Sequence, residues 1–298
     1  MEDIKLDHKY IVAISGGVDS ICLLNLLLRG TKDNSNKFII IAHLDHGIRK
    51  ESKKDRILVE KISKKYSLQF VYEEIKLGKA ASEELARKYR YEFLNKIKKD
   101  FNAYGIMTAH HQDDLLETFF INLIRGTNRR GLSSLKSTPE LLRPLLNYSK
   151  KEIIEYALNN KLVWNEDITN LNTNYLRNYL RIKLIPKLTI SQRNEGVEII
   201  KRQQILNEKI DYNLGNIIRL FDKNKIPRIW FNTLSLNIQK ELIGYLLRLN
   251  NFSAYTNKML LRLALLLKVS KTSAIIEVSK GIYFKVDKTV LALELPER

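Results

Sequence analysis

Residues 15–20, with the sequence Ser-Gly-Gly-Val-Asp-Ser, have the composition of a phosphate-binding turn. They separate two apolar runs: residues 10–14 are typical of a buried strand, and residues 21–28 are typical of a helix. Backbone N–H groups at such a turn, with the positive end of the helix dipole, attract an anion. An ordinary Gly/Ser turn is the alternative, but the pattern favours a nucleotide-binding loop. The candidate residues of this loop are Ser15, Gly16, Gly17, Val18, Asp19 and Ser20.

Asp19 is the one acidic residue of this turn. A carboxylate beside phosphate-binding N–H groups could hold a metal ion that bridges phosphates. The turn is not a Walker loop, because no Gly-Lys-Ser/Thr follows it. The sequence therefore indicates a different kind of nucleotide site, with Asp19 as its candidate metal ligand.

A second polar cluster, residues 43–49, follows the next predicted strand and reads His-Leu-Asp-His-Gly-Ile-Arg. Imidazoles, a carboxylate and a guanidinium at a strand end can surround a nucleotide and a second substrate. We therefore take His43 as a nucleotide-binding candidate and Asp45 as a catalytic one. A plain loop with a hydrogen-bonded aspartate is the alternative, and the histidine spacing makes a metal site a weaker interpretation.

The third cluster, residues 108–118, runs from a predicted strand end into a helix. Asp113 and Glu117 are four residues apart and share one helix face. The apolar residues of this helix form the face that packs on a sheet, so the acids are left to face the strand ends. They are Leu115, Leu116, Phe119, Phe120, Leu123 and Ile124. An aspartate in a first helical turn also caps the helix, which is the simpler explanation for Asp114.

Helix capping does not fully explain these polar clusters, because four of the five histidines of the chain lie in the second and third clusters. A zinc site built from His110, His111 and Asp114 is a rival interpretation. We favour acid–base or orienting roles for these side chains. The candidate catalytic residues are Asp45, Asp114 and Glu117, followed by Asp113 and His110.

Several basic segments accompany these clusters. A predicted helix carries two arginines three residues apart, which can bind phosphate or carboxylate from one face. A basic loop follows the acidic helix, and a further helix at residues 175–184 offers a track for RNA phosphates. A solvated charged face is the alternative for each. The candidate substrate-binding residues are Arg87, Arg90, Arg125, Arg177 and Arg181.

The first 125 residues alternate between strand-like and helix-like segments. Predicted strands cover residues 10–14, 38–43, 68–73 and 105–109. Predicted helices cover residues 20–28, 51–66, 82–99 and 114–124. This alternation predicts an α/β fold, with a parallel sheet and helices on both faces. Ligands of such sheets bind beyond the carboxyl ends of the strands, where the three polar clusters lie.

The pattern changes in the second half of the chain. Residues 128–147 read as loop, and residues 149–160 and 175–184 read as helices. A long helix is predicted over residues 193–221, a short linker over 222–225, and two amphipathic helices over 235–249 and 256–267. The tail, residues 273–295, predicts a small antiparallel meander. We expect a catalytic domain at residues 1–190 and a smaller, mainly helical, RNA-binding domain at residues 191–298.

Composition narrows the class of partner and the compartment. The formal net charge of +18 favours an anionic polymer as partner, although a generally basic surface is the alternative. The single cysteine excludes an intramolecular disulfide and a cysteine-rich metal site, which favours a reducing cytoplasm. No long uncharged apolar run is present, so we expect no membrane span and no signal peptide. The oligomeric state stays open, with a homodimer among the options.

The motifs, taken together, resemble those of the tRNA(Ile)-lysidine synthetase family of PP-loop ATP pyrophosphatases. The phosphate loop is followed, in the family's order and spacing, by HLDHGIR, ARKYRYEF, TAHHQDDLLET, RGTNRRGL, RPLL, DITN and RNYLR. The resemblance covers residues 9–190 and is loose beyond them, where the chain looks like a short form of the family's tRNA-binding region.

The resemblance implies an activity and its substrates. Members of the family convert the wobble cytidine of a CAU-anticodon isoleucine tRNA to lysidine: ATP adenylates the C2 oxygen, the ε-amine of L-lysine attacks C2, and AMP departs. It implies ATP and Mg²⁺ as cofactors, with Asp19 holding the metal, and the carboxylates Asp45, Asp114 and Glu117 orienting or deprotonating the lysine amine. Arg87, Arg90 or Arg125 would hold the lysine carboxylate or an RNA phosphate.

Three rival functions are weighed against this expectation. A tRNA thiolase shares the phosphate loop but needs more cysteines than Cys22. An NAD- or GMP-forming synthetase acts on a small substrate, which the basic charge does not favour. An RNA-binding module without catalysis would not need the clusters around Asp19, Asp45 and Glu117. Exchange of pyrophosphate into ATP, with and without tRNA, separates these readings.

Overall fold

A computed structural model describes the chain except for residues 32–33, 46, 48–51, 76, 79–82, 134, 166–175, 223 and 296–298. The chain divides into two compact units. The first unit contains residues 1–121 and 134–198, and the second contains residues 122–133 and 199–298. Each unit is described by itself below.

The first unit is built on a five-stranded sheet in which all neighbouring strands are parallel. The strand order is β3-β2-β1-β4-β5. The strands are β1 (Tyr10–Ala13), β2 (Ile39–Asp45), β3 (Gln69–Glu74), β4 (Gly105–Met107) and β5 (Leu141–Leu142). The predicted parallel α/β fold is therefore confirmed. The prediction of loop throughout residues 128–147 is wrong at residues 129–132, which form the short helix α6 (Arg129–Leu132), and at β5. Both elements are too short for a periodic pattern to show.

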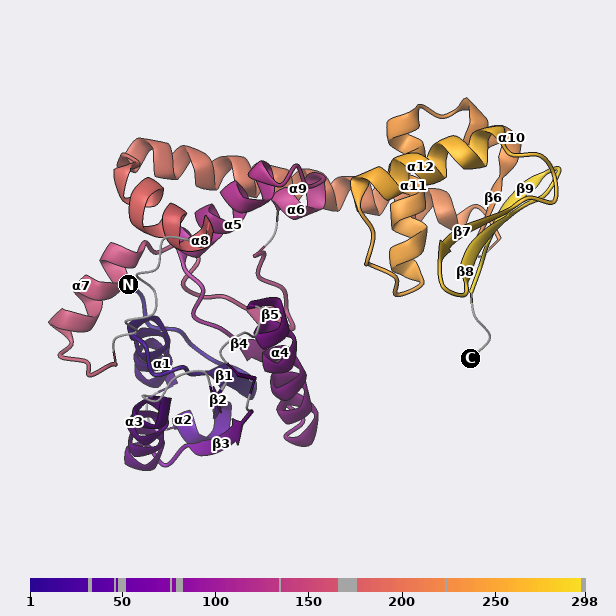
Figure 1. Cartoon of the computed structure of the whole chain (residues 1–298). Helices are drawn as coiled ribbons and strands as arrows, with labels where there is room; N and C mark the ends of the chain where they lie inside the picture. The colour runs from indigo at the N-terminus through magenta and orange to yellow at the C-terminus, as the bar shows by residue number, and fades with distance from the viewer. Residues whose placement is uncertain are drawn as a thin grey trace. The chain divides into compact units, whose positions relative to one another are not determined.

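Helices connect these strands (Figure 1). The first are α1 (Val18–Thr31), α2 (Ser35–Phe38), α3 (Ser52–Lys65), α4 (Glu83–Asp100) and α5 (Gln112–Ile124). They are followed by α6 (Arg129–Leu132), α7 (Lys150–Asn159), α8 (Leu176–Tyr179) and α9 (Ile190–Arg219). In the described part of the chain, no helix is both long and apolar enough to cross a membrane.

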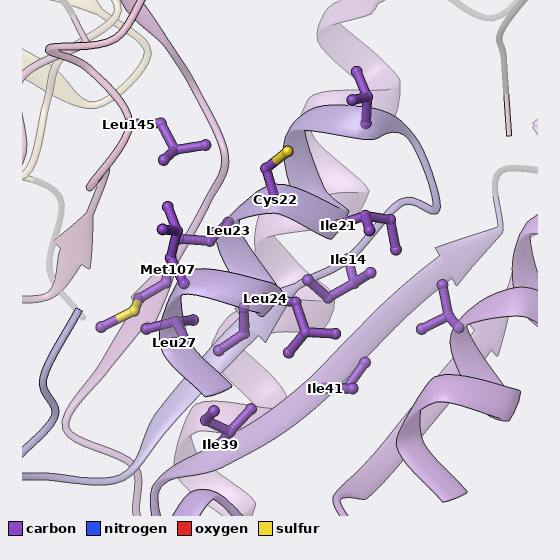
Figure 2. Packing of buried hydrophobic residues seen from close by; sticks show 14 of the residues in the cluster. Ile14, Ile21, Cys22, Leu23, Leu24, Leu27, Ile39, Ile41, Met107 and Leu145 are labelled. Atoms are coloured by element: carbon purple, nitrogen blue, oxygen red, sulfur yellow. The ribbon is translucent and has the colours of Figure 1, made fainter. Parts of the chain in front are cut away.

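Alternate residues of the central strands pack on opposite faces of the sheet, as the two-residue period of a strand requires. Val12 and Ile41 belong to a core with α1, α3 and α7, whose residues around Cys22 and Leu23 are shown in Figure 2. Ile11 and Ile40 belong to a separate core with α4. Helices therefore cover both faces, and these strands are buried throughout.

The strand order determines where a ligand can bind. The chain passes from β1 to β2 on one side, whereas β4 lies on the other side of β1. Connections that leave neighbouring parallel strands toward opposite faces open a crevice beyond the strands' carboxyl ends. The segments that follow β1 and β4 are the phosphate loop and the His110–Glu117 cluster, so the fold brings these two together.

The second unit contains a small antiparallel sheet with the order β6-β9-β8-β7. Its elements are β6 (Lys225–Pro227), α10 (Arg228–Thr233), α11 (Leu236–Leu249), α12 (Asn257–Val269), β7 (Ile275–Ser279), β8 (Ile282–Val286) and β9 (Val290–Glu294). Phe231 and Phe284 are completely buried in its core with residues of α11 and α12. The predicted meander is confirmed.

The sheet nevertheless has one strand more than the meander. Lys225 ends the segment that was predicted to be a linker, and it pairs with Ala292 of β9 at the start of β6. Pro227 ends the same strand, at the edge of the sheet, where a missing N–H group is tolerated. In the sequence, Pro227 interrupts the helical pattern and indicates the end of a linker. For this reason β6 was not predicted.

Residues 122–133 belong to the second unit, and the side chain of Arg129 links them to the rest of it. The Arg129 side chain is only 12% exposed, and its Nη2 lies 2.7 Å from Asp211 Oδ1. Its Nε donates to Glu241 Oε2 at 2.9 Å, and its Nη1 donates to Asn207 Oδ1 at 2.9 Å. A charge this well paired holds the segment firmly, because separating the pairs would leave buried charges uncompensated. The functional division at residue 190 stays a prediction.

Candidate active site

The phosphate loop is a tight turn held by its own serines. The N–H of Gly16 donates to Ser20 Oγ at 3.2 Å, and Ser20 Oγ donates to the carbonyl of Gly17 at 2.9 Å. The N–H of Ile21 reaches the same Gly17 carbonyl at 3.1 Å, so α1 starts immediately after Gly17. The N–H groups of Val18, Asp19 and Ser20 consequently have no carbonyl within the helix to bind. This is the donor set that the sequence predicted for phosphate.

The turn depends on glycine at position 16. Gly16 has φ +94°, a conformation that L side chains rarely adopt, and a Cβ added to it would lie 3.1 Å from Asp55 Cβ. Asp55 is itself held by Asn165, whose Nδ2 donates to Asp55 Oδ1 at 2.8 Å. The N–H of Asn165 donates to the carbonyl of Gly16 at 3.1 Å. Helix α3 and the segment after α7 therefore both fix the shape of the turn.

Asp19 is held by a lysine that the sequence analysis missed. Lys150 Nζ lies 2.6 Å from Asp19 Oδ1 and 2.8 Å from Oδ2. The Nε2 atom of the buried His111 lies 3.7 Å from Asp19 Oδ1 and 3.4 Å from Asp114 Oδ2. Lys150 begins α7 behind a capping box formed by Ser149 and Glu152, and in sequence it looks like any first-turn surface lysine.

The guanidinium of Arg181 contacts both Glu117 and Asp114. Arg181 binds Glu117 through two parallel contacts, Nε to Oε1 at 2.7 Å and Nη2 to Oε2 at 2.9 Å. The same Nη2 lies 2.9 Å from Asp114 Oδ1. Arg177 Nε approaches Glu117 Oε2 at 3.9 Å. Glu117 has no exposed surface, so the helix and these arginines enclose it completely.

Burial and the neighbouring charges shift the pKa values of Glu117 and Asp114 in opposite directions. Burial raises the pKa of Glu117 to about 7, and the charges of Asp114 and Asp113 act in the same direction against Arg181. Burial would also raise the pKa of Asp114, but His111, His110 and Arg181 outweigh it, and the pKa of Asp114 is lowered. Two acids whose pKa values are pushed apart are typical of a site that moves protons.

Arg181 lies in an irregular part of the chain. Residues 175–184 were predicted to form one helix, but α8 gives way to a π-helix at Leu180–Leu184 and then to a 3₁₀ turn at Ile185–Lys187. A π-turn is rare and is frequently found at functional sites. The predicted helix is confirmed over residues 176–184, but the change to a π-helix was not predicted, because helical periodicity does not distinguish a π-turn from an α-turn.

The carboxyl end of β2 contributes a neutral imidazole, His43, and a buried acid, Asp45. His43 Nδ1 lies 2.7 Å from the carbonyl of Ile14, so this nitrogen carries the proton, and the ring stacks on Tyr72. Burial lowers the pKa of His43, which keeps the ring neutral at pH 7. Among the described residues, none binds its buried Nε2. Asp45 accepts the N–H of Gly47 at 2.8 Å. His46, Ile48 and Arg49 lie outside the described residues.

His110 and Asp113 have different surroundings. The Nδ1 atom of His110 lies 2.8 Å from Thr108 Oγ1, and burial, with the charges of nearby arginines, lowers its pKa to about 4. Asp113 Oδ1 accepts the backbone N–H of Lys150 at 3.2 Å and a contact from Arg193 Nη1 at 2.9 Å. Asp113 thus anchors the start of α7, and its predicted catalytic role stays a prediction. Arg193 was not predicted, because α9 shows it only as one cation of many.

The remaining predicted arginines are spread over several elements. Arg87 and Arg90 lie on α4 and are exposed, with the guanidinium of Arg87 5.1 Å from the Tyr91 ring centre. Arg125 is exposed and belongs to the second unit. Their substrate-binding roles stay predictions. The DITN segment, residues 167–170, lies outside the described residues.

The groups of this site are better suited to binding the phosphates of ATP than to binding a metal ion by themselves. Within the described ranges, no three His, Cys, Asp or Glu side chains are grouped to hold a metal ion, so nothing supports the rival zinc site of His110, His111 and Asp114. Mg²⁺ keeps several waters and is often bound by one or two carboxylates plus substrate phosphates. Asp19, with 29% of its side chain exposed beside the loop, fits that mode once phosphates are bound.

Residues 1–188 match the family model described as a PP-loop domain, and the chain belongs to this family of ATP-binding domains. The match contains the phosphate loop and the carboxylates Asp19, Asp45, Asp113, Asp114 and Glu117.

Among curated proteins, the chain is similar to several tRNA(Ile)-lysidine synthases. It is 41% identical over 190 residues to the one from Thermosipho africanus, which covers 61% of this chain and 44% of that protein. It is 37% identical over 203 residues to the one from Clostridium tetani, with 65% and 43% covered. The chain thus spans less than half the length of these relatives. Among solved structures, the U34-tRNA thiolase NcsA of Methanococcus maripaludis shares the fold, with a TM-score of 0.56 at 18% identity over 68% of this chain and 74% of that one.

We expect Gly16→Ala to weaken ATP binding at least about tenfold. The added Cβ must move Asp55 or the turn, in addition to the roughly 1–2 kcal/mol that a left-handed conformation costs an L residue. Gly126→Ala is the matched control, because Gly126 also has a positive φ but a Cβ there meets nothing within 4 Å. Titration calorimetry with ATP measures both. Equal ATP affinities in the two variants would show that the shape of the turn is not needed.

Proposed function

We propose that this chain ligates L-lysine to the C2 position of the wobble cytidine in isoleucine tRNA with a CAU anticodon. The observation that carries the proposal is a series of contacts that runs from Asp19 of the phosphate loop through His111, Asp114 and Arg181 to the buried Glu117, whose pKa is about 7. The chain matches lysidine synthases over this domain. The loop binds the ATP phosphates, and the buried acids handle the attacking amine. ATP and Mg²⁺ are the proposed cofactors, with Asp19 as the metal ligand; the metal would neutralise charge on the leaving pyrophosphate.

The buried carboxylates match the difficult step. A free lysine ε-ammonium has a pKa of about 10.4 and must lose a proton before its nitrogen can attack. Glu117 accepts that proton on a carboxylate oxygen, the nitrogen lone pair forms the new bond to C2, and the bond from C2 to the AMP oxygen breaks. Arg181 occupies both oxygens of Glu117 here, so the ammonium has to displace it first. Asp114 stays ionised and orients the ammonium.

The thiolase alternative is disfavoured by the chain's single cysteine. Cys22 is buried in the core of α1, and its Sγ donates to the carbonyl of Ile153 at 3.4 Å. Burial raises the pKa of this thiol to about 12, whereas sulfur transfer needs a thiolate. A reducing cytoplasm is the compartment that we propose for the protein.

The direct test is lysine incorporation. We expect the protein, with ATP and Mg²⁺, to attach labelled lysine to isoleucine tRNA with a CAU anticodon and to release AMP and pyrophosphate in equal amounts. Methionine tRNA, which has the same anticodon, serves as the control and should stay unlabelled. Folded protein that leaves label in the isoleucine tRNA at background would refute the proposal.

Glu117→Gln tests the proton acceptor. A positioned base contributes about 10²–10⁴-fold to rate, so lysidine formation should fall by that factor while ATP affinity is kept. In the unaltered protein the carboxylate is needed ionised, so the rate should rise with pH through about 7, the pKa of Glu117. The variant should lose this inflection, whereas further deprotonation of free lysine at higher pH remains. An unchanged inflection in Glu117→Gln would assign it to another group.

We further propose that the second unit binds the tRNA, which keeps the predicted role of residues 191–298. Helix α12 carries no acidic residue, and its cations Lys258, Arg262 and Lys268 are exposed beside Leu261 and Leu265. A helix face with three exposed cations and no acid suits the phosphate backbone of RNA, and phosphate contacts make such binding strongly dependent on salt.

Neutralising Lys258, Arg262 and Lys268 together should lower the slope of log affinity for tRNA against log salt by up to about two to three, since each phosphate contact contributes about 0.7–0.9. The matched control neutralises Lys61, Lys64 and Lys65 on α3, which changes the total charge equally. Filter binding at several salt concentrations measures both slopes. Equal slopes in the two triple variants would place the RNA elsewhere.

A further inference from the structure

The contact between Lys150 and Asp19 is not explained by stability alone. Both oxygens of the Asp19 carboxylate bind the same ammonium, at 2.6 and 2.8 Å. The Lys150 side chain is 37% exposed and that of Asp19 29%, and ion pairs this close to solvent typically contribute at most about 1 kcal/mol. Yet the pair covers the one carboxylate of the phosphate loop.

The backbone of Lys150 is fixed, whereas its side chain can move. Ser149 and Glu152 form a reciprocal capping box at the start of α7, and the N–H of Lys150 binds Asp113. Asp113 is in turn held by Arg193, whose other Nη donates to the carbonyl of Ile185. These contacts hold the Cα position, and among the described residues the end of the side chain contacts Asp19 alone.

Two cations compete for the same carboxylate oxygens. While Lys150 contacts both oxygens of Asp19, a metal ion that approaches this carboxylate meets a second positive charge within contact distance and is repelled by it. Phosphates placed on the N–H groups of Val18, Asp19 and Ser20 would bring negative charge beside this pair. A lysine ammonium is a compact charge that binds phosphate well, so the incoming anion gives Lys150 a second partner at short range.

We propose that Lys150 is an exchangeable counter-ion: it blocks Asp19 against metal ions until phosphates arrive, and then transfers to the phosphates and releases the carboxylate for the metal. Binding is therefore ordered, with the metal entering on the nucleotide rather than before it. The inference rests on the proposed role of Asp19 as metal ligand. It makes Lys150 a positioning residue for the metal and a direct ligand for phosphate.

Lys150→Met tests the exchange, because it removes the charge and keeps the length. With Mn²⁺ as the probe and no nucleotide present, electron paramagnetic resonance should show about tenfold tighter Mn²⁺ binding than in the unaltered protein. Calorimetry with ATP in the absence of divalent ions should show about tenfold weaker binding, because one charge-assisted contact to phosphate is lost. Opposite changes in the two affinities are not expected from a residue that is only structural.

Lys151→Met is the matched control, since Lys151 is the exposed neighbour on the same helix turn, and both its affinities should stay unchanged. In Asp19→Asn, the further change Lys150→Met should no longer tighten Mn²⁺ binding. If circular dichroism shows that Lys150→Met is unfolded, Lys150→Gln takes its place. Mn²⁺ affinity that does not rise in the folded variant would overturn the proposal.

These measurements use neither lysine nor tRNA. A failure of lysine incorporation would therefore leave the exchange intact, and a failure of the exchange would leave the proposed ligation intact.

Discussion

The structure depends on pairing the carboxylates that gather beyond the sheet with cations from later in the chain. Asp19 and Asp113 come from the first turns of α1 and α5, and Glu117 from the second turn of α5, where the ends of β1 and β4 bring them together. Their partners Lys150, Arg181 and Arg193 come from α7, the π-turn and α9. The cost of leaving an acid unpaired differs among them: it is largest for the enclosed Glu117 and small for Asp19, which is partly exposed, because a buried charge is tolerated only when it is paired. The cations therefore hold the later segments against the sheet.

The acids follow the strand ends, whereas their cationic partners come from later segments, and this difference explains which parts of the site were predictable from the sequence. The acids follow strand ends at fixed positions, so strand periodicity and helix spacing were enough to propose Asp19, Asp114 and Glu117 together. Lys150 and Arg193 look like ordinary surface cations of amphipathic helices, and nothing local in the sequence separates them from their neighbours. Their contacts span more than seventy residues, a distance over which periodicity carries no information.

The fold was predictable to the same extent and for the same reason. Long, buried strands such as β2 have an apolar pattern that defines them, whereas β5 and β6 are too short to show one. Arg181 illustrates the limit most clearly. It was proposed from the sequence as a substrate-binding residue, and that role stays a prediction. It reaches Glu117 from a π-turn, and tertiary packing rather than local propensity decides that conformation.

Charge balance also constrains how the site can accept its substrates. In the described structure the acids already have cationic partners, so the site is close to electrically neutral before anything binds. The proposed substrates, a polyphosphate and a lysine ammonium, carry charges of opposite sign. On that proposal, the phosphate would draw a cation away from an acid, and the ammonium would take the place of another at Glu117 or Asp114. Binding by exchange of partners avoids leaving any carboxylate unpaired at low dielectric. A site built in this way favours nucleotide and amine in combination over either alone.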